Sequence, residues 1–294
     1  MKATKQFFSL LLITGLFIFG CEKSTDSQSD STVLYEDAAE SIAAAMGDES
    51  GGATENFADV MIAGGGGSLG TMTPIMDGVD LVTAGVPIYD SVSGWWTVSV
   101  NRSQQNNLVK RSITREYRYR FLKNGIGQKN YIAGNDTATT LRFWIVSGTG
   151  FFQNSRVSHS LTQLKGAWTS NNINKDTVTI TLDSNYVRSG TDTITTRNMQ
   201  RTHKSTLTLT SVNVKAPRYR PLLSTTWRSN FYNAISGTIS GNYTAEITFQ
   251  RGDLYKERSI NRDFTVTVGS GNGTLLMNGN NGSFKIDMQY GYRK

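Results

Sequence analysis

The stretch that decides the fold is residues 109–121, which read VKRSITREYRYRF. Apolar and aromatic residues share one parity of this stretch: Val109, Ile113, Tyr117, Tyr119 and Phe121. Charged and hydroxyl side chains hold the other parity: Lys110, Ser112, Thr114, Glu116, Arg118 and Arg120. Successive side chains of a strand point to opposite faces, so this pattern predicts a long, half-buried β-strand. The pair Asn124-Gly125 then predicts a tight hairpin turn.

The same period of two extends from about Val92 to the end of the chain. Polar turns such as Gly134-Asn135-Asp136 separate the alternating segments and predict roughly ten to twelve strands with short connections. We therefore expect residues 92–294 to be an all-β domain, an antiparallel meander that forms a sandwich, a barrel or a half-open barrel. The prolines Pro217 and Pro221 mark either a sub-domain boundary near residues 216–221 or a loop within one sheet system.

Residues 33–63 form an acidic segment with helical periodicity. Leu34, Ala38 and Ile42 recur at a spacing of four, which predicts a helix that Thr32 begins and Gly47 ends. A second, shorter helix is predicted for residues 54–63. The expected fold is thus mainly β with one or two short N-terminal helices. The glycine-rich residues 64–91 are expected to be a loop or linker.

The first twenty residues have the organisation of a secretory signal peptide. Lys2 and Lys5 precede an apolar run from Phe7 to Phe19. This run is shorter than the roughly 20 apolar residues that a membrane-spanning helix needs. We therefore expect residues 1–20 to direct export and then to be removed.

The leader ends at Ile18-Phe19-Gly20-Cys21, and Cys21 is the only cysteine of the chain. This segment resembles the lipobox of bacterial lipoproteins. Residues 22–32 are polar and contain no apolar residue, so residues 21–32 are expected to comprise the cysteine and a flexible tether. The resemblance implies cleavage between Gly20 and Cys21 and attachment of acyl chains such as palmitate to Cys21. It also implies a cell-envelope protein that is lipid-anchored to a bacterial membrane, with the outer membrane favoured and the domain periplasmic or surface-exposed.

Charge is divided unevenly along the chain. Residues 22–90 contain 13 acids and one base, a net charge of −12, whereas residues 91–294 contain 27 bases and 10 acids, a net charge of +17. Arginines that cluster in sequence with tyrosines are candidates for anion binding: Arg111, Arg115, Arg118, Arg120, Arg218 and Arg220.

Three interpretations of this basic region are open. It is an ordinary solvated strand face, a surface for anionic envelope lipid or polysaccharide, or a docking surface for the chain's own acidic N-terminal segment. Of the two binding interpretations, the internal one is preferred because both charges lie on one polypeptide. Export makes nucleic acid an unexpected partner.

The sequence contains no recognisable catalytic or metal-binding constellation. His159 and His203 are the only histidines, and Cys21 is assigned to the lipid. We therefore expect neither a metal site nor a cofactor other than the covalent lipid, and we expect the protein not to be an enzyme. The preferred function is a non-enzymatic β-rich binding or structural domain. The alternative is a carrier that encloses a lipid or other hydrophobic ligand in a half-barrel cavity.

Overall fold

The computed structural model describes residues 26–67, 69, 79–105, 110–153, 157–196, 199–220 and 224–294. The predicted signal peptide lies outside these residues, as do its cleavage site at Gly20 and the lipidation site at Cys21. Part of the predicted linker, residues 70–78, also lies outside them.

Within the described residues, an antiparallel sheet of 13 strands organises the chain. Neighbouring strands follow the order β1-β3-β4-β8-β9-β10-β11-β12-β13-β14-β15, with β2 beside β3 and β5 beside β4. The strands are β1 (Val79–Ala84), β2 (Ile88–Asp90), β3 (Trp95–Gln105), β4 (Lys110–Lys123), β5 (Ile126–Gln128), β8 (Thr140–Gln153), β9 (Val157–Asn171), β10 (Thr177–Thr196), β11 (Met199–Pro217), β12 (Ser236–Arg251), β13 (Leu254–Gly269), β14 (Asn272–Met277) and β15 (Ser283–Asp287). A separate two-stranded ribbon consists of β6 (Ile132–Ala133) and β7 (Asp136–Thr137). The prediction of a mainly β, antiparallel meander is confirmed.

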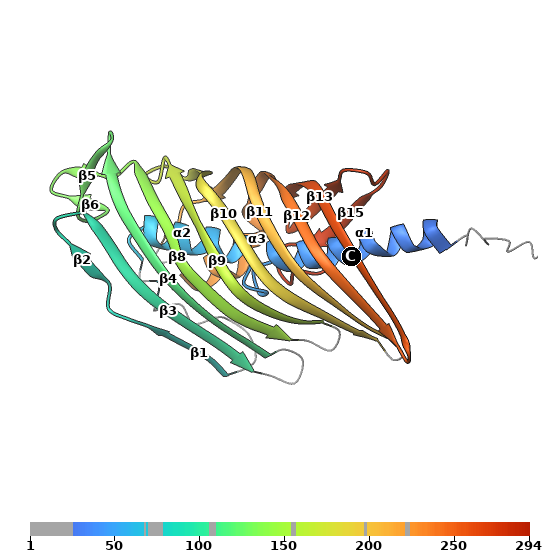
Figure 1. Ribbon diagram of the computed structural model, residues 1–294. Coiled ribbons are helices and arrows are strands. Elements are labelled where there is room, and N and C mark those ends of the chain that lie inside the picture. The colour runs from blue at the N-terminus through green and yellow to red at the C-terminus, as the bar shows by residue number, and fades with distance from the viewer. Residues whose placement is uncertain are drawn as a thin grey trace, which may run out of the picture.

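The sheet does not close into a barrel. β1 and β15 stand at the two ends of the pairing order, and no pairing between them occurs within the described residues. Instead the sheet curves around three helices, α1 (Asp26–Met46), α2 (Ala53–Gly64) and α3 (Ser224–Ala234), as Figure 1 shows. Sheet and helices form two layers of a sandwich-like arrangement. We call the sheet face toward the helices the inner face and the opposite one the outer face.

The side chains of β4 alternate between these two faces, as its sequence predicts. Arg111, Ile113, Arg115 and Tyr117 are buried on the inner face. The residues between them are half-buried or exposed on the outer face. The period of two therefore divides the arginines of this strand into two groups with different surroundings.

Register shifts bend the longest strands. The pairing of β10 with β11 is interrupted between Thr181 and Tyr186, and the pairing of β11 with β12 is interrupted between Leu209 and Ser211. Such bulges add an unpaired residue on one strand and increase its local twist. They allow β10, which has 20 residues, to curve around the helical layer.

The helix α1 is longer than its sequence predicts. It begins at Asp26, so residues 26–32 of the predicted tether are helical. The tether was predicted because these residues are polar and have no apolar face to bury. In a continuous helix the packing of later turns stabilises the whole element, and the first turns need only an acceptable helix propensity.

The structure corrects two other predicted boundaries. β1 and β2 lie within residues 64–91, which were predicted to be a linker; with six and three residues they are too short to give a clear alternation. α3 lies within the predicted all-β domain. Its sequence is rich in Ser, Thr and Asn, which are weak helix formers, and only Trp227 and Phe231 mark its apolar side. These two rings lie 4.9 Å apart between centroids.

The stretch at 216–221 connects parts of one sheet. β11 ends at Pro217, and β12, which follows α3, pairs with β11 from Gln200 to Lys215. Strands on both sides of the stretch also contribute to one continuous cluster of buried apolar residues. The described strands on both sides of this stretch therefore belong to one sheet.

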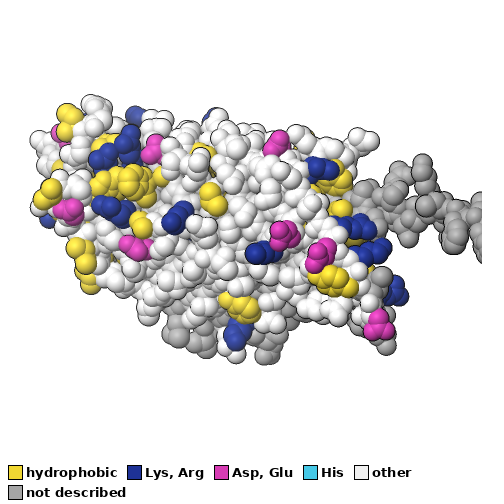
Figure 2. Space-filling view, viewed as in Figure 1, with side chains coloured by type: hydrophobic (Ala, Val, Ile, Leu, Met, Phe, Trp, Pro, Cys, Tyr) yellow, Lys and Arg dark blue, Asp and Glu magenta, His cyan; other side chains and the backbone are white. Residues whose placement is uncertain are grey.

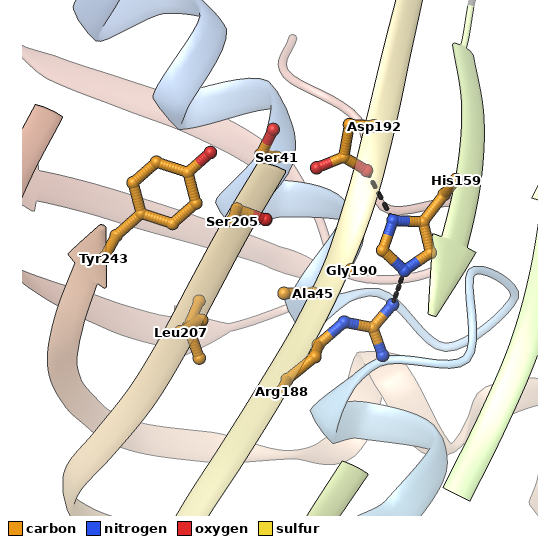
Figure 3. A pocket seen from close by; sticks show the side chains of 9 residues that line it. All are labelled: Ser41, Ala45, His159, Arg188, Gly190, Asp192, Ser205, Leu207 and Tyr243. Atoms are coloured by element: carbon orange, nitrogen blue, oxygen red, sulfur yellow. Dashed lines mark hydrogen bonds and ion pairs between the residues drawn. The ribbon is translucent and has the colours of Figure 1, made fainter. Parts of the chain in front are cut away.

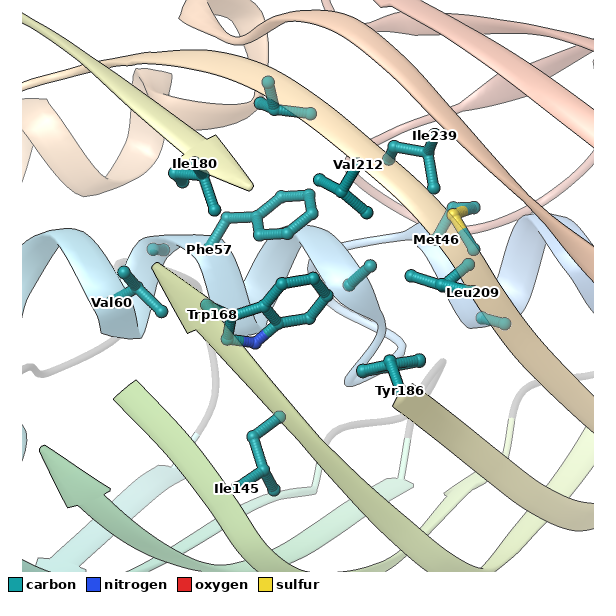
Figure 4. Packing of buried hydrophobic residues seen from close by; sticks show 14 of the residues in the cluster. Met46, Phe57, Val60, Ile145, Trp168, Ile180, Tyr186, Leu209, Val212 and Ile239 are labelled. Carbon is teal, nitrogen blue, oxygen red and sulfur yellow. The ribbon is translucent and has the colours of Figure 1, made fainter. Parts of the chain in front are cut away.

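The centre of the core lies between α2 and the inner face, where large aromatic side chains fill the space. Phe57 of α2 meets Trp168 of β9 edge to face, with 5.1 Å between ring centroids. Trp168 in turn lies 5.2 Å from Tyr186 of β10, and none of the three is exposed. Figure 4 shows side chains of helix and strands interlocked around this aromatic group. Dense packing of this kind supplies most of the stability of the helix–sheet contact.

Candidate functional site

Buried ions join α2 to the inner face. Glu55 and Asp59 stand one helical turn apart on α2, and both are fully buried. Arg102 of β3 lies 3.0 Å from Glu55 Oε1 and 2.6 Å from Asp59 Oδ1. Arg111 of β4 lies 2.9 Å from the same Glu55 oxygen. Buried charges are tolerated when they are paired and hydrogen-bonded, so these four side chains fix α2 in one position on the sheet.

The surroundings of this cluster raise the pKa values of Arg102 and Tyr117. Burial by itself disfavours the charged form of Arg102, but Asp59 and Glu55 outweigh it and raise the pKa of Arg102 well above its ordinary value. The Tyr117 hydroxyl donates to Asp59 Oδ2 at 2.6 Å. Burial, followed by the charge of Asp59, raises the pKa of Tyr117 well above its ordinary value. Both groups therefore stay protonated at neutral pH.

Two arginines hold the connection between α1 and α2. The carbonyl oxygen of Gly51 accepts hydrogen bonds from Arg188 of β10 at 2.8 Å and from Arg115 of β4 at 3.3 Å. Arg115 also donates to the carbonyl oxygen of Thr149 at 2.6 Å. Gly51 has a φ of +73°, and a Cβ atom there would lie 2.8 Å from Ile113 Cδ1. Glycine therefore lets the backbone come close enough for both arginines to reach it.

His159 of β9 lies between two charged partners on the inner face. Its Nδ1 atom contacts Asp192, and its Nε2 atom lies 2.7 Å from Arg188 Nη2, as Figure 3 shows. A guanidinium only donates, so Nε2 accepts and the ring proton resides on Nδ1, which donates to Asp192. Burial opposes the charge of Asp192, but His159 and the nearby Ser41 outweigh it and lower the pKa of Asp192.

This arrangement does not match a hydrolytic triad. Ser41 and Ser205 line the same small cavity, which has a volume of about 10 Å³. A triad needs a histidine nitrogen free to take the proton of the serine, and both nitrogens of His159 already have partners. The cavity has room for about one water molecule. Through Arg188, which donates to the carbonyl oxygen of Gly51, the group links the sheet to the connection between α1 and α2.

A third contact joins the first helix to the sheet. Asp37 of α1 lies 3.0 Å from Arg201 Nε and 3.5 Å from His203 Nε2, both on β11. At the far edge of the sheet, Arg293 lies 3.3 Å from Glu36 Oε1. The acidic helical segment therefore docks on basic residues of the chain's own β domain, which confirms the preferred interpretation for this part of the basic region.

The six arginines proposed as an anion-binding set occupy three separate places. Arg111 and Arg115 are buried among the inner-face contacts described above. Arg218 lies over the ring of Tyr131, 5.2 Å from its centroid, and Arg220 forms an exposed ion pair of 2.6 Å with Asp176. Arg118 and Arg120 lie on the outer face. The structure therefore brings only the last two together on an accessible surface.

Arg118 and Arg120 belong to a cluster that includes two tryptophans. Their Cζ atoms lie 5.6 and 4.8 Å from the centre of the Trp95 ring, and Trp95 lies 4.4 Å from Trp144 of β8 between centroids. Arg142 of β8 is the register partner of Arg120. We call these five residues the Arg–Trp cluster. Figure 2 shows basic and hydrophobic side chains gathered over β3, β4 and β8 on the visible face.

In comparisons with known proteins, no family model, no curated protein and no solved structure matches this chain. Among the described helices, none has the length and apolar character needed to cross a membrane. Within the same residues, no three His, Cys, Asp or Glu side chains gather in a way that could hold a metal ion.

Several of these residues were not singled out from the sequence. Glu55 and Asp59 had a detectable signal, because they are four residues apart in a helix whose other faces are apolar. Asp192 and His159 had none, since their contact depends on the register between two long strands. Trp144 and Arg142 follow the period of two in β8, but only the pairing of β4 with β8 places them beside Arg118 and Arg120.

Proposed function

We propose that this chain is a lipid-anchored, non-enzymatic protein of the bacterial cell envelope whose β domain acts by binding. The observation that carries the proposal is the division of charge between the two faces. Helical carboxylates pair with Arg102, Arg111 and Arg201 of the inner face, and Arg115 and Arg188 of the same face bind the Gly51 carbonyl oxygen, so the inner face serves stability. The outer face retains arginines with no carboxylate in ion-pair distance among the described residues. Binding chemistry is therefore concentrated on the outer face.

The proposed anchor would hold this domain close to the membrane. With lipid on Cys21 and α1 beginning at Asp26, only residues 22–25 separate the anchor from the helix. Even fully extended, each residue spans at most about 3.6 Å. Two or three acyl chains on one cysteine give stable membrane attachment, whereas a single chain gives only marginal binding. The proposed partners are anionic groups of the envelope that this short connection can reach.

We do not extend the proposal to a carrier of hydrophobic ligands. A carrier requires space between helices and sheet, and the region between α2 and β9 is occupied by Phe57 and Trp168 (Figure 4). Opening it would also break the buried ion pairs of Arg102, which would leave charges unpaired. A binding platform needs neither change.

Palmitate labelling of cells that express the chain tests the anchor. We expect the wild-type protein to incorporate the label and to sediment with the outer membrane, and the Cys21→Ser variant to lose both properties. Ser24→Ala is the matched control, and it should keep both. Label retained by Cys21→Ser, or an unlabelled wild-type protein in the soluble fraction, would rule the proposal out.

A further inference from the structure

We propose that the Arg–Trp cluster on the outer face binds a linear anionic polysaccharide. This inference rests on the proposed function in one respect: the envelope location determines where the protein encounters its ligand. The binding itself can be measured with purified protein. The cluster consists of Trp95, Arg118, Arg120, Arg142 and Trp144 on the adjacent strands β3, β4 and β8.

Like charges oppose each other directly in this cluster. Arg120 and Arg142 are register partners across β4 and β8, and Arg118 stands two residues from Arg120 on the same face. Like charges in such pairs destabilise a sheet. Within the described residues no hydrogen bond or ion pair engages the Arg142 guanidinium, and the buried Nε atoms of Arg118 and Arg120 have no partner. An anion bound between the guanidinium groups would remove this repulsion.

Two carboxylates in this part of the sheet form no ion pair with the cluster. Asp90 of β2 is close enough for Arg118 to contribute to the lowered pKa of Asp90, after the larger effects of Ser93 and Val92. Its side chain is engaged with those two neighbours, at 2.5 Å to Ser93 Oγ and 2.9 Å to the amide of Val92. Glu116 lies on the outer face of β4, as the register partner of Ser99 and Ser147. Neither acid forms an ion pair with the cluster.

The two tryptophans add a second kind of recognition. Trp144 is 37% exposed, whereas Trp95 lies beneath Arg118 and Arg120 and is 6% exposed. An exposed indole beside guanidinium groups can stack on the apolar face of a sugar ring while the arginines bind its carboxylate or phosphate. A small inorganic anion would use the arginines and leave the indole unoccupied.

The sheet continues the cluster as a polar row across successive strands, which points to a polymer. Arg142 is the register partner of Thr169, which leads through Thr181 and Asn213 to Thr238 and Thr267 on successive strands. At about 4.8 Å per strand, the row from β4 to β13 extends roughly 30 Å. Hydroxyl and amide groups along it can bind sugar hydroxyls without adding charge. The row contains no large apolar side chain to enter a lipid layer, so a polysaccharide fits it better than a membrane surface.

Affinity electrophoresis and tryptophan fluorescence of the full chain, purified in detergent, test the inference. The probes are polygalacturonate as a linear anionic polysaccharide, dextran as a neutral one, and phosphatidylglycerol vesicles as an anionic lipid surface. We expect binding to polygalacturonate with a change in tryptophan fluorescence, and little binding to dextran. Equal binding to both polysaccharides, or binding to the vesicles alone, would overturn the inference.

Paired variants locate the site. Arg120→Gln/Arg142→Gln should weaken polygalacturonate binding by about tenfold or more, and Trp144→Ala should abolish most of the fluorescence change. The control Arg251→Gln/Lys256→Gln removes the same charge from the exposed hairpin of β12 and β13. This hairpin is separated from β8 by β9, β10 and β11, and the control should retain binding. Equal loss in both double variants would mean general charge attraction and contradict a site.

Thermal melting separates binding from folding. Arg142→Gln alone should melt at the same temperature as the wild type or higher, because it removes repulsion from Arg120, and it should still bind polygalacturonate more weakly. A lowered melting temperature that parallels the binding loss would assign Arg142 to stability and overturn the proposal. These outcomes are independent of palmitate labelling, so a failed anchor and a failed ligand site are distinguishable.

Discussion

Arg111 and Arg118 belong to the same strand and lie on opposite faces of one sheet, yet they have different roles. Arg111 is buried and pairs with Glu55 of α2 at 2.9 Å. Arg118 lies over the ring of Trp95 and forms no ion pair within the described residues. Both residues are arginines of β4, so their different roles come from the groups that surround each side chain. An inner-face arginine that binds a buried carboxylate or the Gly51 carbonyl oxygen stabilises the fold, whereas Arg118 on the outer face has neither partner and is available to an external anion.

The largest expected effect comes from the inner face. Asp59→Ala removes the partner of both Arg102 and Tyr117 and leaves a buried cation with fewer contacts. We expect the free energy of unfolding in urea to fall by about 3–5 kcal/mol. Asp176→Ala is the control, since it breaks the exposed pair with Arg220 and should leave the unfolding curve unchanged. A small effect of Asp59→Ala would mean that the buried pairs do not fix α2.

A smaller effect concerns the pH dependence of the His159 group. The folded-state pKa of Asp192 is lowered, so its contribution to stability is present above the unfolded pKa of about 4 and is lost as the pH falls through the folded value. Asp192→Asn should cost roughly 1–3 kcal/mol near neutral pH. In acid, urea unfolding should give a smaller difference in the free energy of unfolding between Asp192→Asn and the wild type. An equal difference at both pH values would show that the charge of Asp192 contributes nothing.

The smallest expected change in stability is the response to salt, which should affect the two faces differently. Buried ion pairs are weakly screened, so the free energy of unfolding should change little between about 50 mM and about 500 mM sodium chloride. Binding of polygalacturonate to the outer face should weaken strongly over the same range. A large loss of stability at the higher concentration would indicate that the helices are held mainly by exposed charges.

The alternation of β4 could be predicted because it depends on residues next to each other in the chain. That pattern already placed Arg111 and Arg115 on the apolar side and Arg118 and Arg120 on the other. The prediction of one anion site that contains all four arginines relies on their closeness in sequence, and the alternation of faces contradicts it. The general docking of acidic helices on basic strands was also predictable, since both charges are visible in the composition.

The individual contacts could not be predicted because they depend on register. A bulge between Glu116 and Tyr117 shifts the pairing of β4 with β8, and this shift helps to set which residues meet Arg118 and Arg120. The contact between His159 and Asp192 likewise follows from the irregular pairing of β9 with β10. α3 was missed because its stability comes from the packing of Trp227 and Phe231 rather than from its own propensity.

Urea unfolding of Arg111→Gln beside Arg118→Gln tests the division between the two faces most directly. Both variants make the same substitution in the same strand. Arg111→Gln should lower the free energy of unfolding by about 3–5 kcal/mol, because it leaves Glu55 with fewer buried partners. Arg118→Gln should lower it by less than about 1 kcal/mol, because it removes a cation–π contact with Trp95 and leaves no buried carboxylate without its partner. Equal losses for the two variants would contradict the assignment of the inner face to stability and the outer face to binding.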